Sequence, residues 1–526
     1  MPGTENTTDR QMNSVFIEAT LSGLIVLLMP GLLYGSSNRP DNRPNILFIM
    51  SDDHTTQAIG AYGSRLAELN PTPNIDALAK GGMLFDRVFC NNSICTPSRA
   101  SIITGQYSQT NGVLDLTGNI ASERQYLPKE MGQAGYHTAM IGKWHLKQEP
   151  AAFDYYCVLP GQGKYFDPAF RVPGDSPWPR NTISRKGQHS SDAITDLSLK
   201  WLKDAWDHDR PFFLMHHFKA PHDMFQNAPR YDSYLNDVSI PEPANLHDQP
   251  AAGFGSVASR GYGSGLAKGH EKWQLGRRLA VDQSLTDPEY TRAVYQRYLK
   301  RYLRCVKGVD DNVRRLVDFL RDAGQLDNTV IIYTADQGFF LGEHDLMDKR
   351  WIYEEAMRMP FIVHYPAGVK AGSRNDWLIN NTDFAPTILG LAGVVTPAQM
   401  QGRSFASALH GRARPPDWRT ATYYRYWMHM AHNLRVPAHF GIRTDRYKLI
   451  FYYGCTPSGK QKTPAAWELY DLKNDPSEMQ NEYTSPDHAQ VVAELKKQLW
   501  KTRATLNETD SKYPEIQVII DAQEGI

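Results

Sequence analysis

Asn45-Ile-Leu-Phe-Ile-Met-Ser-Asp-Asp53 is the stretch from which the architecture of this chain can be inferred. From Ile46 to Met50 every residue is apolar, which is typical of a strand buried on both faces of a parallel sheet. Ser51 and the two aspartates follow directly, where the strand is expected to end. Similar apolar runs recur at 137–142, 211–215, 329–335 and 360–365.

Helical patterns lie between these runs, at 74–80, 191–206 and 298–323. Strands that alternate with helices predict βαβ crossovers, and therefore an α/β fold with a large, mainly parallel sheet flanked by helices. After Pro397 the pattern changes to short aromatic-rich strands at 447–453 and 467–471 and a closing helix at 489–506. We therefore expect an α/β domain at 43–396 and a smaller C-terminal α+β subdomain with an antiparallel sheet at 397–526.

The first 42 residues are expected to be an export segment and a linker. The apolar run at 21–35 is shorter than the ~20 residues of a membrane-spanning helix and suits the core of a signal peptide. No stable membrane span is therefore expected, and the protein is predicted to be exported to the periplasm or the medium. Because Glu18 precedes the run and no basic residue flanks it closely, an uncleaved N-terminal anchor is the alternative. A second segment, 249–274, is rich in Gly, Ala and Ser and is predicted to be a surface insertion.

Composition excludes several classes of protein. Lysine plus arginine and aspartate plus glutamate are equal at 57 each, so no overall field attracts nucleic acid or an anionic membrane. The chain is 41% hydrophobic and 22% charged, as globular proteins are. Its five cysteines are too scattered for a disulfide framework and form no CxxC pair. One disulfide between two of them is left as an alternative.

Polar side chains follow each of the predicted strands. Asp52 and Asp53 follow the first, Lys143 and His145 the second, His222 comes after the third, and Asp336 and Gln337 follow the fourth. The carboxyl ends of parallel strands meet at one edge of a sheet, which is where ligands bind in such folds. The oxygen donors among these residues suit a hard cation, Ca²⁺ or Mg²⁺. The alternative for an isolated pair of aspartates is a helix cap or a solvated loop.

One cysteine stands in a longer motif, Cys95-Thr-Pro-Ser-Arg99, which continues Ala100-Ser-Ile-Ile-Thr-Gly105. A second copy, Cys455-Thr-Pro-Ser-Gly459, lacks the arginine and serves as an internal control. The first motif resembles the signature by which type I (formylglycine-dependent) sulfatases, in the alkaline phosphatase superfamily, have a cysteine oxidised. Further blocks that carry the resemblance are Gly142-Lys-Trp-His-Leu146, Ala220-Pro-His222, Thr334-Ala-Asp-Gln-Gly338, Gly342-Glu-His344 and Trp467-Glu-Leu-Tyr-Asp471.

The resemblance implies an alkaline-phosphatase-like fold, a chemical modification of Cys95 and a bound metal ion. A formylglycine-generating enzyme would convert Cys95 to 3-oxoalanine (formylglycine), and a calcium ion would bind beside it. The implied metal ligands are Asp52, Asp53, Asp336, Gln337 and the modified residue 95. Many relatives carry Asn or His at the position of Gln337, which keeps an amide oxygen but reaches one methylene further.

The resemblance also implies catalytic roles. One hydroxyl of the hydrated aldehyde would attack sulfur, and loss of a proton from the second hydroxyl would later expel sulfate. His145 would take that proton and His222 would protonate the leaving oxygen, while Arg99, Lys143 and Lys349 would hold the sulfate. Each histidine and lysine, taken alone, has the plainer interpretation of a core or surface residue.

The expected activity is hydrolysis of sulfate esters in a sulfated oligo- or polysaccharide. The segments 218–225 and 439–449 are similar to those of bacterial glycan sulfatases. The alternatives are a phosphonate or phosphate monoester hydrolase of the same superfamily, and a sulfated-glycan binding protein that never converts Cys95. The aromatic segment 423–439 fits either a sugar pocket or packing between the two parts of the chain.

Overall fold

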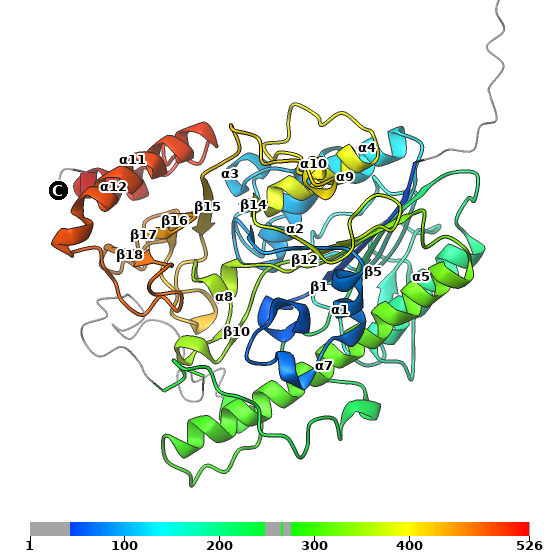
Figure 1. Ribbon diagram of the computed structural model, residues 1–526, viewed down its shortest axis with the longest axis horizontal. Coiled ribbons are helices and arrows are strands. Elements are labelled where there is room, and N and C mark those ends of the chain that lie inside the picture. The colour runs from blue at the N-terminus through cyan, green and yellow to red at the C-terminus, as the bar shows by residue number, and fades with distance from the viewer. Residues whose placement is uncertain (1–42, 248–264, 267–274, 525–526) are drawn as a thin grey trace, which may run out of the picture. The chain divides into compact units, whose positions relative to one another are not determined.

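The computed structural model describes residues 43–247, 265–266 and 275–524 (Figure 1). The expected export segment and most of the expected insertion at 249–274 lie outside these ranges. In the described part of the chain, no helix is both long enough and apolar enough to cross a membrane. The described residues belong to one compact unit, and the boundary at 396/397 stays a prediction.

The main sheet has ten strands in the order β13-β2-β12-β9-β1-β8-β4-β5-β6-β7. The five central strands from β9 to β5 run parallel to one another. These strands are β1 (Asn45–Ser51), β4 (His137–Lys143), β5 (Tyr155–Leu159), β8 (Phe212–His217) and β9 (Thr329–Ala335). The outer strands are β2 (Met83–Phe85), β6 (Ala169–Arg171), β7 (Thr182–Ser184), β12 (Phe361–His364) and β13 (Ser373–Asn375). The predicted large, mainly parallel sheet is confirmed.

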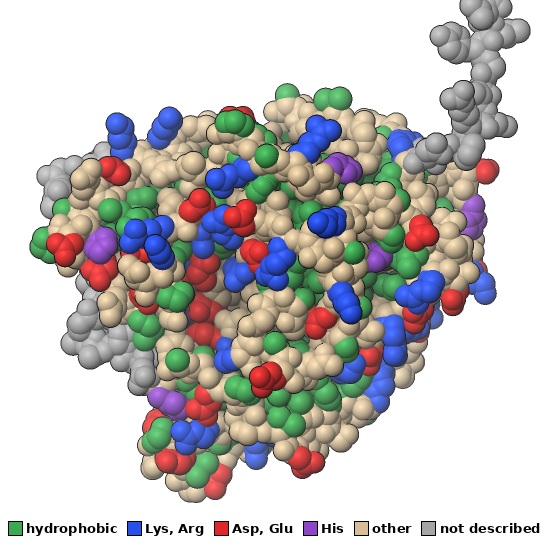
Figure 2. All heavy atoms as spheres, in the orientation of Figure 1, with side chains coloured by type: hydrophobic (Ala, Val, Ile, Leu, Met, Phe, Trp, Pro, Cys, Tyr) green, Lys and Arg blue, Asp and Glu red, His purple; other side chains and the backbone are tan. Residues whose placement is uncertain are grey.

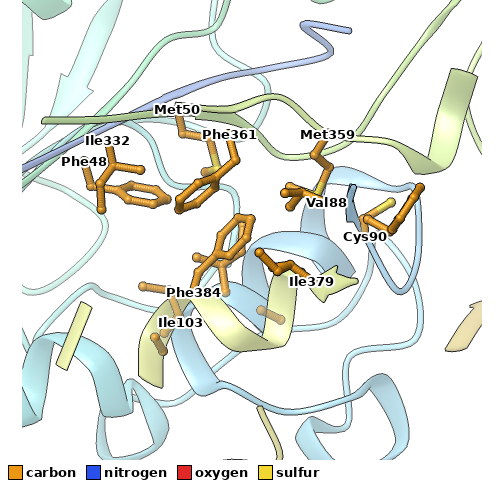
Figure 3. Packing of buried hydrophobic residues seen from close by; sticks show 14 of the residues in the cluster. Phe48, Met50, Val88, Cys90, Ile103, Ile332, Met359, Phe361, Ile379 and Phe384 are labelled. Atoms are coloured by element: carbon orange, nitrogen blue, oxygen red, sulfur yellow. The ribbon is translucent and has the colours of Figure 1, made fainter. Parts of the chain in front are cut away.

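Helices cover both faces of this sheet (Figure 1). Alternate residues of β1 enter two separate cores, with Phe48 in one and Leu47 in the other. The first core includes residues of α2 (Cys95–Thr104), α4 (Tyr126–Gln133) and α9 (Phe384–Leu391). The second includes residues of α1 (Pro73–Lys80), α5 (Ser190–Asp204) and α7 (Glu289–Asp322). Figure 3 shows Phe48, Phe361 and Phe384 packed together in the first core.

The C-terminal region forms a separate four-stranded antiparallel sheet. Its strands follow in chain order: β15 (Ala421–Tyr426), β16 (His439–Thr444), β17 (Tyr447–Tyr452) and β18 (Ala466–Asp471). One face sends Tyr424 and Tyr452 into the first core, and the other sends Phe440 and Trp467 into a third core. That third core includes residues of α11 (Ala489–Thr505) and α12 (Pro514–Glu524), which Figure 1 shows in red beside the orange strands.

The remaining described strands and α-helices are short. They are the strands β3 (Val88–Phe89), β10 (Phe340–Leu341), β11 (Met347–Asp348) and β14 (Ile379–Asn380), and the helices α3 (Ser108–Asn111), α6 (Leu275–Arg278), α8 (Glu354–Met357) and α10 (Ala406–Leu409). Figure 2 shows lysine and arginine side chains interspersed with acidic ones over the viewed face, in keeping with the net charge of zero.

Two features differ in detail from the sequence expectation. The run at 360–365 forms β12, which is antiparallel to its neighbours β9 and β2, because an apolar run does not encode strand direction. Helix α7 begins at Glu289, nine residues before the expected start at Tyr298. Its first turns bury Tyr290, Val294 and Tyr295, so the apolar stripe continues upstream.

Candidate active site

Cys95 is the first residue of α2, and its side chain is buried at the carboxyl edge of the main sheet. Ile94 before it is extended, so the chain turns into the helix directly at the cysteine. A helix N-terminus carries unpaired N–H groups and a partial positive charge. The Cys95 thiol donates to Asp52 Oδ1 at 3.2 Å.

Three carboxylates meet beside this thiol. Asp52 and Asp53 follow β1, and Asp336 follows β9. The two strands are parallel neighbours, so the carboxylates leave the sheet side by side. The main-chain N–H of Asp53 donates to Asp336 Oδ1 at 3.1 Å, and one oxygen from each of the three carboxylates lies within 4.8 Å of the others.

Gln337 completes a set of oxygen donors. Its Nε2 donates to Asp53 Oδ1 at 2.5 Å and lies 3.7 Å from Cys95 Sγ. Its Oε1 is buried and accepts no hydrogen bond from the described residues. A buried acceptor without a donor is costly, and a cation is the partner that three carboxylates and an amide oxygen would share. The residues present therefore fit Ca²⁺ or Mg²⁺.

Each carboxylate also has its own cationic partner. Lys143 pairs with Asp52, Lys349 Nζ lies 2.6 Å from both oxygens of Asp53, and Arg99 Nε lies 2.9 Å from Asp336 Oδ2. The two lysine ammonium groups lie 3.9 Å (Lys143) and 3.7 Å (Lys349) from Cys95 Sγ. Arg99 Nη2 is buried and donates no hydrogen bond to the described residues. Positive groups thus surround the cysteine, and one donor still lacks an acceptor.

Burial shifts the pKa values of these groups in different directions. Burial raises the pKa of Asp53, although Lys349 and His222 oppose it. For Asp336, burial raises the pKa, but Arg99, Lys143, Lys349 and the hydrogen bond from the Asp53 N–H together outweigh it and lower the pKa. Burial lowers the pKa of Lys143 well below its ordinary value. At Lys349 burial acts in the same direction, but Asp53, Cys95, Asp348 and Asp336 together outweigh it and raise the pKa.

The Cys95 thiol itself is not activated. Burial raises its pKa to about 12, although Lys349 acts in the opposite direction. A thiol with this pKa is protonated at neutral pH, and the thiolate is the form that attacks or binds a metal. An unmodified Cys95 is therefore poorly suited to act as a nucleophile here.

Two histidines lie near the cysteine. His145 is two residues beyond Lys143, has a left-handed φ of 58°, and its Nδ1 lies 3.4 Å from the hydroxyl of Thr96. His222 Nε2 lies 3.9 Å from Asp53 Oδ2. Burial lowers the pKa of both imidazoles, so both are neutral at neutral pH.

The structure brings the residues singled out from the sequence into this one cluster: Asp52, Asp53, Cys95, Arg99, Lys143, His145, His222, Asp336, Gln337 and Lys349. Their roles in metal binding and catalysis stay predictions. The five cysteines all lie in the described ranges, and each of them is a free, buried thiol.

Three more residues belong to the cluster but were not found from the sequence. Gln162 Oε1 accepts from Lys143 Nζ at 2.6 Å, and Asp223 Oδ1 lies 2.5 Å from His222 Nδ1. This contact leaves His222 Nε2 facing the carboxylates. Lys219 is buried, with Nζ 4.7 Å from the centre of the Tyr165 ring. Lys219 and Asp223 flank the Ala-Pro-His block and could have been noticed there, whereas Gln162 carries no sequence signal.

Comparison with known protein families gives two matches. The sulfatase family matches residues 44–394. The C-terminal family of N-sulphoglucosamine sulphohydrolase matches residues 342–505. An N-acetylglucosamine-6-O-sulfatase of Bacteroides thetaiotaomicron is 38% identical to this chain, over 97% of both proteins. The human N-acetylglucosamine-6-sulfatase is 27% identical over 73% of this chain and 67% of its own length.

Solved structures give the same picture. A protein in complex with its substrate D-glucosamine-2-N,6-O-disulfate is 37% identical, covers 89% of this chain and all of its own, and superposes with a TM-score of 0.80. A phosphonate monoester hydrolase of Agrobacterium radiobacter is 20% identical, over 88% of this chain and 96% of its own, with a TM-score of 0.67. The second likeness is one of fold alone.

Proposed function

This chain belongs to the sulfatase family, and from that membership we propose that it removes the 6-O-sulfate of a glucosamine residue in a sulfated glycan. That the protein is a sulfatase follows from the family match and from its likeness to a sulfatase along nearly its whole length. The choice of sugar is supported by one observation. The relative that is 38% identical is an N-acetylglucosamine-6-O-sulfatase. The 37% identical protein of known structure holds a 6-O-sulfated glucosamine as its substrate.

We further propose that Cys95 is converted to 3-oxoalanine by a formylglycine-generating enzyme and that a calcium ion binds beside it. The protonated, buried thiol and the oxygen-only donor set support both additions. The hydrate of such an aldehyde supplies a hydroxyl that can attack sulfur, and a divalent cation supplies positive charge beside it. The ligands we assign are Asp52, Asp53, Asp336 and Gln337, together with the modified residue 95.

The three cations around residue 95 would hold the sulfate group. Arg99 presents a planar set of donors, one of which has no acceptor among the described residues. The ammonium groups of Lys143 and Lys349 lie close to the cysteine sulfur. Fixed positive charges in a site closed to water stabilise an oxyanion whose charge redistributes as the S–O bond breaks.

The two histidines would move the protons. His222, held by Asp223 through Nδ1, presents Nε2 for the oxygen of the departing sugar. His145 stands beside Thr96, next to the nucleophile position, and would accept the proton whose loss expels sulfate. His222 has to take up a proton before it can act as the acid, and the Asp223 carboxylate beside it favours that protonated form. His145 is neutral and can accept a proton directly.

The test is release of free sulfate by protein co-produced with a formylglycine-generating enzyme. Glucosamine 6-sulfate, its N-acetyl and N-sulfated forms, galactose 6-sulfate and a 2-O-sulfated uronate disaccharide make up the panel. We expect release from the 6-O-sulfated glucosamines and little from the others. Release from galactose 6-sulfate alone would overturn the choice of sugar.

A phosphonate or phosphate monoester hydrolase is the second candidate, because proteins of that activity share the fold. Sulfate and phosphate esters of one aryl alcohol should be compared at equal concentration. Faster turnover of the phosphate would favour this candidate. If mass analysis shows an intact thiol at Cys95 in protein from its native host, and that protein is inactive, a sulfated-glycan binding protein would be favoured instead. Export likewise remains our proposal, made from the apolar run at 21–35.

A further inference from the structure

The segment 160–188 is markedly basic within a chain whose net charge is zero. It carries five lysine and arginine side chains against two carboxylates. The cations are Lys164, Arg171, Arg180, Arg185 and Lys186, and the acids are Asp167 and Asp175. We call this segment the basic border.

The basic border contacts the active-site region near its start and again at Trp178. Gln162 accepts from Lys143 at 2.6 Å, and the Tyr165 hydroxyl donates to the carbonyl of His222. Further along, Trp178 Nε1 donates to the carbonyl of Lys147 at 3.2 Å, two residues beyond His145. A segment that contacts both Lys143 and the loop after His145 is placed to meet the parts of a substrate that extend beyond the catalytic centre.

Three of its cations are free to bind a ligand. Lys164, Arg180 and Lys186 are exposed and form no ion pair with the described residues. One of the two nearby acids, Asp167, uses its carboxylate to accept from the Gly187 N–H at 2.6 Å. Each of the three cations therefore offers an uncompensated charge at the surface.

Protection of an exposed sheet edge is the plainer explanation, since β7 is the last strand of the sheet and charged residues on such strands prevent aggregation. It does not account for Lys164, which lies outside the strands and two residues from Gln162. Nor does it account for Phe166, whose side chain is 40% exposed and packs edge-on against His189. An exposed ring beside uncompensated cations suits a ligand with both apolar faces and anionic groups.

We propose that the basic border binds the sugar residues adjacent to the one that loses its sulfate. Lys164, Arg180 and Lys186 contact their sulfate or carboxylate groups, and Phe166 packs against a sugar ring. This inference rests on the proposed function and specifies in addition that the substrate extends over more than one sugar residue. The enzyme then has a lower KM for sulfated oligosaccharides than for sulfated monosaccharides.

The test compares wild type with the triple variant Lys164→Ala/Arg180→Ala/Lys186→Ala on a sulfated hexasaccharide and on glucosamine 6-sulfate. For the hexasaccharide, KM should rise about tenfold, or ~1.4 kcal/mol, while KM and kcat for the monosaccharide stay within about twofold. The dependence of the hexasaccharide KM on salt should also weaken, because exposed charges are screened by ions. Phe166→Ala should raise the hexasaccharide KM without changing its salt dependence.

The matched control removes cations at the other end of the sheet. There Lys370 and Arg412 line a cavity of about 520 Å³ beside β13 and β2. Lys370→Ala/Arg412→Ala should leave the hexasaccharide KM unchanged. An equal rise in this control, or no rise in the triple variant, would overturn the proposal.

Calorimetric binding of the same hexasaccharide separates this inference from the proposed function. If wild type binds the hexasaccharide and releases no sulfate, the proposed function is wrong. Weaker binding by the triple variant would then still support oligosaccharide binding by the basic border. If wild type releases sulfate and the triple variant binds the hexasaccharide as tightly as wild type, the binding role of the basic border is wrong and the proposed function is kept. Equal thermal unfolding midpoints would show that the variants are folded.

Discussion

The hydroxyl of Tyr424 donates a hydrogen bond to the main-chain carbonyl of Arg350 at 2.6 Å. The same hydroxyl accepts from the main-chain N–H of Ser93 at 3.2 Å. Ser93 lies two residues before Cys95, and Arg350 directly follows Lys349. A single buried side chain of β15 therefore joins the segment that carries the nucleophile position to the segment that carries a site lysine.

Tyr424→Phe should impair catalysis beyond its effect on stability. Two hydrogen-bonded segments lose their shared partner, which should lower the free energy of unfolding by ~1–3 kcal/mol. Small displacements of residue 95 and Lys349 should lower kcat about ten- to hundredfold, because catalysis depends steeply on geometry. Steady-state kinetics and denaturant unfolding measure the two effects separately.

Tyr423→Phe is the matched control for this prediction. Tyr423 is the preceding residue of the same strand and faces the third core, and its buried hydroxyl has no hydrogen-bond partner among the described residues. Its removal should change neither kcat nor stability appreciably. Equal losses in the two variants would mean that Tyr424 does not position the site.

Cys95→Ala should abolish sulfate release, whereas Cys455→Ala should leave kcat nearly unchanged. Both cysteines begin a Cys-Thr-Pro-Ser run, but only Cys95 lies among the three carboxylates and the site cations. Peptide mass analysis should find the aldehyde at position 95 alone. A loss of the same size in both variants would mean that Cys455 is essential for the structure or that the wrong cysteine has been chosen.

Gln337→Met should weaken calcium binding without unfolding the protein. The substitution keeps the length of the side chain and removes the one amide oxygen of the donor set. We expect the calcium-induced rise in the thermal unfolding midpoint to require about ten times more calcium, since stabilisation by a ligand depends on the ratio of its concentration to Kd. Gln162→Met, which removes the amide that contacts Lys143, should keep the calcium response of wild type.

Asp510→Ala should destabilise the C-terminal region strongly. Asp510 is buried and pairs with two buried guanidinium groups, those of Arg425 at 2.6 Å and of Arg503. Removing it leaves two buried charges without a partner, which should lower the free energy of unfolding by ~3–5 kcal/mol. Asp417→Ala, which breaks the exposed pair with Arg403, should cost less than ~1 kcal/mol. Similar costs for the two variants would contradict this account.

The strands and the position of the site could be predicted from the sequence because both depend on a local pattern, an apolar run followed directly by polar residues. The apolar run of β1 is continuous because both of its faces are buried, and Asp52 is the first residue after the strand ends. A parallel sheet then brings such strand ends together, so Asp336 could be placed beside Asp52 without coordinates.

What could not be predicted depends on long-range geometry. Strand direction is absent from an apolar run, so the antiparallel β12 was not foreseen. Gln162 lies in an irregular segment after β5, and nothing in its neighbours indicates contact with Lys143. The link between Ser93 and Tyr424 spans 331 residues and joins the segment before α2 to strand β15, which no local pattern encodes.

The ion pair between Asp53 and Lys349 joins residues 296 positions apart. Contacts of such high sequence separation close large loops, and proteins rich in them fold slowly. During synthesis the nucleophile position leaves the ribosome long before Lys349 exists to cover it. Once folded, the Cys95 side chain is only 1% exposed. An enzyme that modifies this cysteine therefore has to act after residue 95 is translated and before folding buries it. Slow folding lengthens that interval.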